Sequence, residues 1–184
     1  MLLGCVTYNV LRDMDLETVI KTLEATGYDA VELRTTHRHG VEPGLSAEER
    51  RQVRGRFGRS GVRLLSYGTT CEFQSPEAAE RRRQVETGRQ FVDLAHDTGA
   101  WGVKVRPNGF PEGAPRAETV KRIATALGEL GEYGEGRGVE IWLEVHGKGT
   151  EEPAVCAEIL RATGHRSVGI CWNSNPADVV DGSV

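Results

Sequence analysis

Five times along this chain a glycine is followed, within a few residues, by a short strand-like segment. The five are Gly27, Gly61, Gly99, Gly138 and Gly164. Glycine is the usual residue at a helix end, where the backbone turns left-handed, so each repeat indicates a helix followed by a strand. With the opening segment 2–9, the pattern predicts six strand–helix units in a single domain over residues 1–184. Such alternation builds a parallel sheet, which carries its functional residues where the strands end.

The segments between these strands are predicted to be amphipathic helices. Apolar residues recur at helical spacing from Leu16 to Leu23, with Asp13 or Asp15 as the N-cap. Ser46 and Glu49 form a capping-box pattern before the second helix. The third helix is expected to have Ser75 as its cap and Pro76 in its first turn, and to continue to about residue 96. The predicted strands end in polar or amphipathic residues, namely Arg34, Tyr67, Arg106, His146 and Asn173.

The alternation of side chains along the strands favours a closed barrel over an open, doubly wound sheet. Along 103–106 the two valines alternate with Lys104 and Arg106, and along 141–146 apolar residues alternate with Trp142, Glu144 and His146. One face of the sheet is therefore apolar and the other gathers charge. A sheet covered by helices on both faces would be apolar on both. A barrel interior can turn polar near its mouth, so we expect a TIM-type (β/α) barrel.

The number of repeats indicates a partial barrel. A complete TIM barrel takes about 250 residues and eight strands, whereas this chain has 184 residues and six predicted strands. We therefore expect six of the eight βα units, with the chain truncated after the sixth strand; a natural open barrel is the alternative. The tail 175–184 resembles a loop that stops before its next helix. A fragment of this kind is expected to be inactive and marginally stable on its own.

Composition narrows the classes of partner. The formal net charge is −4, and the clustered arginines are interleaved with glutamates, which disfavours nucleic acid and anionic membranes as partners. Apolar runs do not approach the roughly 18 residues of a membrane helix. The four cysteines form no Cys-x-x-Cys pair, which is typical of reduced thiols and favours a cytoplasmic location. A homo-oligomer is compatible with this composition.

Glu144 and His146 are the strongest candidates for chemistry. They stand two apart on one predicted strand, so both side chains point to the same face at its carboxyl end. Asn173 arrives on that face from the next strand. Oxygen ligands from Glu144 and Asn173 suit Mn²⁺, Mg²⁺ or Co²⁺ better than Zn²⁺. The alternative is a polar layer that closes the barrel mouth.

Positive side chains are predicted at the same mouth. Lys104 and Arg106 could bind a carboxylate, a phosphate or an enolate-like oxyanion of the substrate. They could equally serve as counter-ions of Glu32 and Glu144. Glu32 itself, inward on the second strand, and His37, in the loop that follows it, are further candidates for substrate contact.

At three places the chain resembles the xylose isomerase-like TIM-barrel superfamily, which contains sugar isomerases, epimerases and the endonuclease IV group. The segments are 27–34 (Gly-Tyr-Asp-Ala-Val-Glu-Leu-Arg), 143–147 (Leu-Glu-Val-His-Gly) and 168–176 (Val-Gly-Ile-Cys-Trp-Asn-Ser-Asn-Pro). The resemblance implies a divalent metal held by a glutamate ending strand 5, an aspartate ending strand 6, a histidine from strand 7 and a glutamate from strand 8. Glu144 matches the first ligand and Asn173 occupies the second position. The last two have no counterpart here.

The resemblance implies a metal-dependent sugar or sugar-acid isomerase or epimerase that acts by proton transfer next to a carbonyl. Glu144 would be both metal ligand and base, and His146, Arg106, Lys104, Glu32 and His37 would contact the substrate. Two other functions stay open. One is a metal-dependent lyase or hydrolase on the same scaffold. The other is a non-catalytic carbohydrate-binding barrel, which Asn173 favours because the amide removes a negative charge from the metal position.

Overall fold

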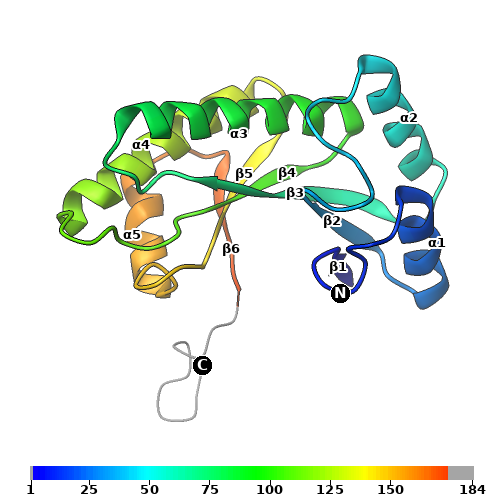
Figure 1. Ribbon diagram of the computed structural model, residues 1–184, viewed down its shortest axis with the longest axis horizontal. Helices are drawn as coiled ribbons and strands as arrows, with labels where there is room; N and C mark the ends of the chain where they lie inside the picture. The colour runs from blue at the N-terminus through cyan, green and yellow to red at the C-terminus, as the bar shows by residue number, and fades with distance from the viewer. Residues whose placement is uncertain (1, 174–184) are drawn as a thin grey trace, which may run out of the picture.

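A computed structural model describes residues 2–173 and contains one six-stranded parallel sheet (Figure 1). Its strands lie in chain order: β1 (Gly4–Val6), β2 (Ala30–Arg34), β3 (Arg63–Glu72), β4 (Gly102–Arg106), β5 (Glu140–Glu144) and β6 (Val168–Cys171). The helices are α1 (Leu16–Thr26), α2 (Ala47–Gly58), α3 (Ala78–Thr98), α4 (Arg116–Glu135) and α5 (Pro153–Thr163). Each neighbouring pair of strands is parallel. The predicted tail 175–184 lies outside the described residues.

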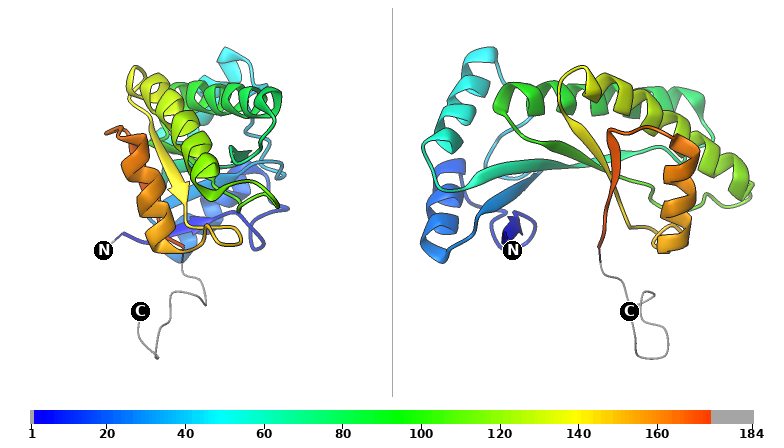
Figure 2. Two further views of the ribbon diagram at one scale, coloured as in Figure 1. Left: turned by 90° about the vertical axis from the view of Figure 1, so that its left-hand side faces the viewer. Right: turned by 180° about the vertical axis from the view of Figure 1, so that it is seen from behind.

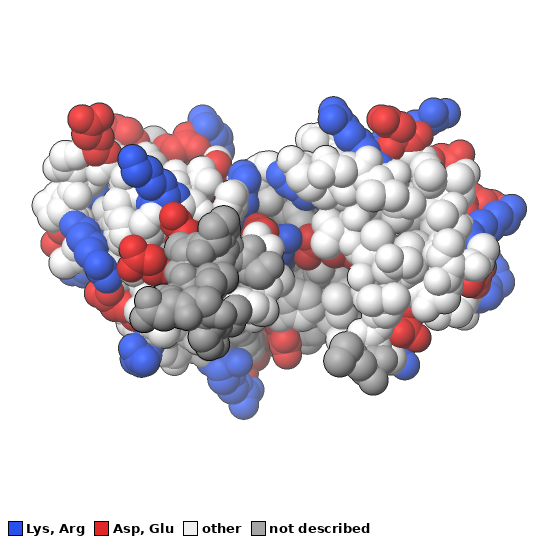
Figure 3. Space-filling view, turned by 90° about the horizontal axis from the view of Figure 1, so that it is seen from below, with Lys and Arg blue, Asp and Glu red and all other residues white. Residues whose placement is uncertain are grey.

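The sheet is curved, and the helices cover only its outer face (Figures 1 and 2). The concave face is left open, and a view from below shows charged side chains at the bottom of a hollow (Figure 3). Six strands in sequential order with helices on one side are the architecture of a partial (β/α) barrel. The predicted barrel class is confirmed, and the doubly wound alternative, with helices on both faces, is excluded.

The alternation of side chains matches the prediction from sequence. Val31, Leu33, Val103 and Leu143 are fully buried between the sheet and the helices. Burying each such side chain stabilises the fold by about 1.5–3 kcal/mol. Their polar neighbours in sequence, which include Lys104, point to the concave face, because successive side chains of a strand point to opposite sides.

Two of the three predicted helix starts are confirmed. Asp15 caps α1 by accepting a hydrogen bond from the Thr18 amide at 2.8 Å, and Ser46 forms the capping box of α2 with Glu49. The start of α3 differs, because the helix begins at Ala78 with Glu77 as its N-cap residue. The Ser75 hydroxyl accepts from the Glu77 amide at 3.1 Å and so shapes the turn before the helix.

Strand β3 ends five residues beyond the position that the sequence predicts. The prediction ended it at Tyr67, but the strand continues to Glu72. Tyr67 therefore does not reach the rim: its ring is 1% exposed beneath α3, and its hydroxyl is 2.8 Å from the Thr98 hydroxyl. Burial raises the pKa of Tyr67 well above its usual value. The polar residue that ends β3 is Glu72, in register with Arg106 of β4.

The cysteines and the helix lengths add two findings. All four cysteines are free thiols, of which Cys71 and Cys156 are buried. Among residues 2–173, every helix is too short or too polar to span a membrane.

The edge strands β1 and β6 carry exposed apolar side chains, including Val6 at 40% and Ile170 at 39% exposure. Trp172 is 56% exposed just beyond β6.

His39 ties the loop after β2 to the end of that strand. Its side chain is buried, and its Nε2 lies 2.9 Å from the Arg34 carbonyl oxygen. Its Nδ1 accepts a hydrogen bond from the Val41 amide at 3.0 Å. This pattern requires a neutral ring protonated on Nε2. Burial lowers the pKa of His39 and outweighs the opposing effects of the Arg34 carbonyl and Glu42.

We therefore expect His39 to make the protein sensitive to acid. The folded-state pKa lies below the ordinary value of 6.5, so below that pH the unfolded chain binds more protons than the folded one. Stability is then fully present above about pH 6.5 and falls as the pH drops. Urea denaturation at about pH 7.5 and about pH 5.5 should show a smaller acid loss for His39→Gln than for the unmodified chain. His96→Gln, at an exposed position on α3, is the control, and an equal acid loss in the two variants would contradict the assignment.

Candidate functional site

A cavity of about 430 Å³ opens at the carboxyl ends of the strands. Residues from β1 to the segment after β6 line it: Val6, Tyr8, Arg34, Thr69, Lys104, Arg106, Glu144, His146 and Asn173. Five of the predicted site residues therefore come together there, namely Glu144, His146, Arg106, Lys104 and Asn173. Glu32 and His37 do not line the cavity.

A chain of opposite charges crosses the floor of this cavity. Lys104 Nζ lies 2.7 Å from Glu32 Oε1 and 3.4 Å from Glu144 Oε1. The side chains of Lys104 and Glu32 are only 11% and 7% exposed, and that of Glu144 is 15% exposed. β2, β4 and β5 bring the three groups together, because each carries its charged residue on the concave face. The arrangement leaves Glu144 as the carboxylate that faces the cavity.

Lys104 is held in its charged form. Burial acts to lower its pKa, but the Glu32 carboxylate, with a smaller contribution from Glu144, raises it above the usual value. An amine that stays protonated does not act as a base. It can instead stabilise negative charge that develops on a substrate oxygen.

Glu32 lies behind the cavity wall as a partner of Lys104. Its Oε2 accepts a hydrogen bond from the Ser66 hydroxyl at 2.9 Å. Gly68 on β3 makes room for it, since a Cβ atom there would lie 2.7 Å from Glu32 Oε1. Of the two roles considered from sequence, this geometry favours the counter-ion over the substrate contact.

Arg106 is oriented by a polar network that the sequence reading missed. Glu72 Oε1 lies 3.6 Å from Arg106 Nη2, while Glu72 Oε2 accepts from Gln74 Nε2 at 2.9 Å and also from Asn108 Nδ2. The Nε atom of Arg106 is buried and has no hydrogen-bond partner among the described residues. Arg106 therefore brings a guanidinium group to the cavity with donor capacity to spare.

Arg34, Thr69 and Tyr8 complete the wall. Arg34 Nη1 donates to the Gly68 carbonyl at 3.0 Å, and no ion pair joins Arg34 to any described carboxylate. Thr69 donates to the Lys104 carbonyl at 2.8 Å and so holds β3 against β4. Arg34 could be located from its strand-end position, whereas Thr69 belongs to the part of β3 that the sequence reading treated as a loop.

His37 does not line the cavity but packs against Tyr8, which does. Its Nδ1 lies 3.2 Å from the Thr7 hydroxyl, and its ring stacks on that of Tyr8 with 6.5 Å between centroids. Burial lowers the pKa of His37, helped by the neighbouring His39. The structure thus places His37 against a residue of the cavity wall, and its proposed contact with substrate stays a prediction.

His146 is held by two loops that pack closely. The Thr150 hydroxyl donates to the His146 carbonyl at 2.7 Å and accepts from the Gly109 amide at 2.8 Å. Gly147 has a φ of +90°, and a Cβ atom there would lie 2.6 Å from the Gly109 nitrogen. A side chain at position 147 would push the two loops apart, so glycine is required beside His146.

The described residues do not form a metal centre on their own. No group of three or more His, Cys, Asp or Glu side chains among residues 2–173 could hold a metal ion. Glu144 and Asn173 offer two oxygen donors at the cavity, and one Glu144 oxygen faces Lys104 at 3.4 Å. The metal ligands predicted from sequence therefore stay a prediction, and they are at most part of a ligand set.

Comparison with known proteins gives a family and a set of similar folds. The profile of a family described as xylose isomerase-like TIM barrel matches residues 20–174. No curated protein sequence matches the chain.

Solved structures resemble the chain along almost its whole length. The IOLI protein with a binding zinc atom is 20% identical, with a TM-score of 0.78 over 92% of this chain and 62% of its own. D-psicose 3-epimerase with D-tagatose, from Clostridium cellulolyticum H10, is 15% identical, with a TM-score of 0.81 over 100% and 68%. The probable 3-DHS dehydratase AsbF from Bacillus anthracis is 12% identical, with a TM-score of 0.73 over 94% and 62%. At these sequence identities the similarity shows a shared fold alone. The chain spans 62% of the length of the IOLI protein.

Proposed function

The chain belongs to the xylose isomerase-like TIM-barrel family, and on this premise we propose that it acts in the isomerisation or epimerisation of a sugar or sugar acid. The observation that carries the proposal is Glu144. Its carboxylate faces the cavity at the carboxyl end of β5 with the charged Lys104 3.4 Å away. A base beside a fixed positive charge is the arrangement that proton transfer next to a carbonyl needs.

Each cavity residue has a role in this proposal. Glu144 removes the proton from the carbon next to the substrate carbonyl and returns it to that carbon or to its neighbour. Lys104 stabilises the negative charge that the carbonyl oxygen gains in the transition state. His146, which lines the same cavity, orients a substrate hydroxyl by hydrogen bonding.

The guanidinium groups favour an anionic substrate. Arg34 has no carboxylate partner among the described residues, and Arg106 meets Glu72 only at 3.6 Å with its Nε unused. Arginine binds carboxylate and phosphate groups with two parallel hydrogen bonds. We therefore favour a sugar acid or a phosphorylated sugar over a neutral sugar.

A divalent metal is part of the proposal. Glu144 and Asn173 would be the ligands on the described part of the chain, and the ion, Mn²⁺, Mg²⁺ or Co²⁺ by its oxygen donors, would polarise the substrate carbonyl. The remaining ligands would come from residues other than those described. Asn173→Asp is expected to tighten Mn²⁺ binding measured by calorimetry, because it restores a negative charge at the second ligand position.

The test is product formation from matched pairs of substrates. Ketoses are incubated with the full-length gene product and Mn²⁺ beside their 6-phosphates and the corresponding keto sugar acids, and epimers or isomers are separated by chromatography. We expect turnover of the anionic members of each pair. Turnover of the neutral sugars alone would overturn the anionic assignment, and no isomer or epimer from any member would overturn the proposed function.

A lyase on the same scaffold is the second candidate, since one similar fold is that of a dehydratase. Elimination also begins with removal of a proton next to a carbonyl, so Glu144 would keep its role as base. The same chromatography separates the two reactions, because a lyase yields an unsaturated product that has lost water, whereas an isomerase or epimerase conserves mass.

A further inference from the structure

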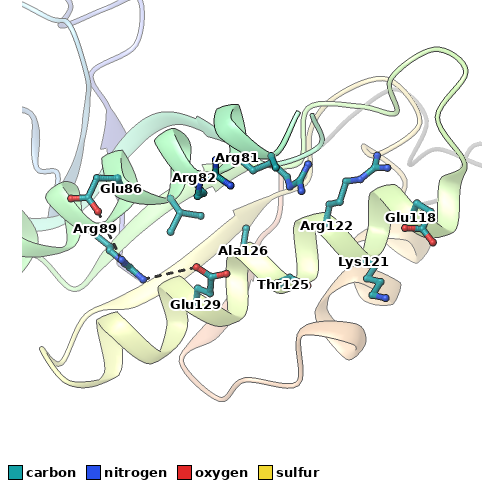
Figure 4. Close-up of a pocket in the computed structure, with 12 residues that line it drawn as sticks. Arg81, Arg82, Glu86, Arg89, Glu118, Lys121, Arg122, Thr125, Ala126 and Glu129 are labelled. Atoms are coloured by element: carbon teal, nitrogen blue, oxygen red, sulfur yellow. Dashed lines mark ion pairs between the residues drawn. The ribbon is translucent and has the colours of Figure 1, made fainter. Parts of the chain in front are cut away.

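A second cavity lies on the outer face of the barrel, in the groove between α3 and α4 (Figure 4). Its volume is about 670 Å³, and side chains from the first two thirds of both helices line it. The helices separate this groove from the concave face that holds Glu144. The groove is therefore distinct from the site described above.

Three arginines line the part of the groove near the helix N-termini, and none has a carboxylate partner among the described residues. Arg81 and Arg82 come from α3 and Arg122 from α4 (Figure 4). None of the three forms an ion pair with a described residue. Arg81 Nη1 donates to the carbonyls of Ser75 and Pro76, both at 2.8 Å. The Nη1 atom of Arg122 is buried and has no hydrogen-bond partner among the described residues.

The carboxylates of the groove do not neutralise this cluster. Glu86 and Glu129 lie at the other end, each 3.9 Å from Arg89. Glu118 precedes Arg122 by four residues, a spacing at which ion pairs form readily on helices. The structure nevertheless contains no ion pair between them. The three arginines therefore line the groove without a carboxylate that neutralises them among the described residues.

Two helix N-termini add to the positive field at this end. α3 and α4 follow adjacent parallel strands, so both begin on the same side of the barrel. Their N-cap residues, Glu77 and Pro115, make no side-chain capping hydrogen bond. The amide groups of the first helical turns and the positive ends of both helix dipoles are thus available to an anion.

We propose that this end of the groove binds a phosphate group, either as free phosphate or as the phosphate of an ester. A tetrahedral dianion accepts several hydrogen bonds, which suits a groove lined by several guanidinium groups better than a single chloride does. Bound phosphate would supply the negative charge that the groove lacks beside Arg81, Arg82 and Arg122. The site depends on these residues alone and does not rest on the reaction proposed for Glu144.

Thermal unfolding tests the site with inorganic phosphate as the probe. Millimolar phosphate is compared with sodium chloride at equal ionic strength, and glycerol 3-phosphate forms a second arm that separates free phosphate from an ester. We expect phosphate at about five times its Kd to raise Tm by about 3 °C over chloride, because the stabilisation grows with the ratio of ligand concentration to Kd. A larger rise with glycerol 3-phosphate would identify an ester as the ligand.

Variants locate the effect within the molecule. Arg82→Gln/Arg122→Gln should abolish the phosphate-dependent rise in Tm. Arg83→Gln should retain it, because Arg83 is exposed on the same helix and pairs with Glu80. Arg106→Gln, which removes a proposed anion contact at the strand ends, serves as the background of these comparisons, so that the rise in Tm reports on the groove. No difference between phosphate and chloride, an unchanged shift in the double variant, or a loss of the shift in Arg106→Gln would each overturn the proposal.

Discussion

Lys104→Met is expected to lower the free energy of unfolding by about 3–5 kcal/mol, because it leaves the buried Glu32 carboxylate without its counter-ion. The two side chains are 11% and 7% exposed and lie 2.7 Å apart. After the substitution, the Ser66 hydroxyl is the remaining hydrogen-bond donor to Glu32 among the side chains described here. One such contact does not offset the loss of water around a carboxylate. Chemical denaturation at neutral pH measures the effect.

A surface pair of equal length provides the matched control. Lys21 and Glu17 on α1 are 2.8 Å apart, but their side chains are 72% and 60% exposed. Lys21→Met should therefore cost far less stability than Lys104→Met. The double variant Glu32→Gln/Lys104→Met should recover most of the loss, since it leaves no unpaired charge behind. Equal losses for Lys21→Met and Lys104→Met would show that burial of the pair does not matter and would contradict the structure.

Glu144→Gln is expected to lower kcat for isomerisation or epimerisation by about 10²–10⁴-fold, the usual contribution of a general base. The amide has nearly the same shape as the carboxylate but does not accept the substrate proton. Binding through Arg34 and Arg106 does not involve Glu144, so KM should change much less than kcat. Steady-state kinetics on a substrate found in the matched-pair assay separates the two constants.

The control for this variant is Glu132→Gln, on the exposed side of α4, which should keep full activity. Far-ultraviolet circular dichroism and a thermal melt should be close to those of the unmodified chain, because Glu144 lies at the cavity surface. A fall in KM and kcat together, or kinetics equal to those of the control, would assign the base to another residue.

Side-chain alternation was enough to locate much of the site from sequence. β4 and β5 are short and regular, so the inward positions of Lys104, Arg106 and Glu144 follow from counting residues. The apolar residues that alternate with them, such as Val103 and Leu143, must pack against the helices, and this decides which face of the sheet each side chain points to. The cavity then follows from the rule that parallel strands end on one side of the sheet.

The same reasoning failed where a strand was irregular. β3 continues past Tyr67 through a polar stretch, and its register with β4 shifts between Gly68 and Glu72. The prediction from sequence assumed a loop after Tyr67 and so missed Thr69 and Glu72. The two threonines and the cysteine before Glu72 are residues that favour strands, and they are the signal that could have extended the prediction.

Burial and pairing could not be read from alternation alone. Glu32 and Lys104 both face inward, but the distance between neighbouring strands decides that they pair with each other below the cavity. His37 follows β2 in the sequence, yet its contacts with Thr7 and Tyr8 depend on how the loops after β1 and β2 meet. Contacts between loops are set by tertiary packing, which the pattern of a single strand does not contain.

Exchange of substrate hydrogen with solvent tests the role of Glu144 most directly. Keto sugars, their phosphates and keto sugar acids are incubated with the full-length gene product and Mn²⁺ in D₂O, and proton NMR follows the signal of the hydrogen next to the carbonyl. The account predicts that this signal disappears with the unmodified chain and with Glu132→Gln, and persists with Glu144→Gln. Persistence of the signal with the unmodified chain for every compound, or equal exchange by Glu144→Gln, would contradict the assignment of Glu144 as the base.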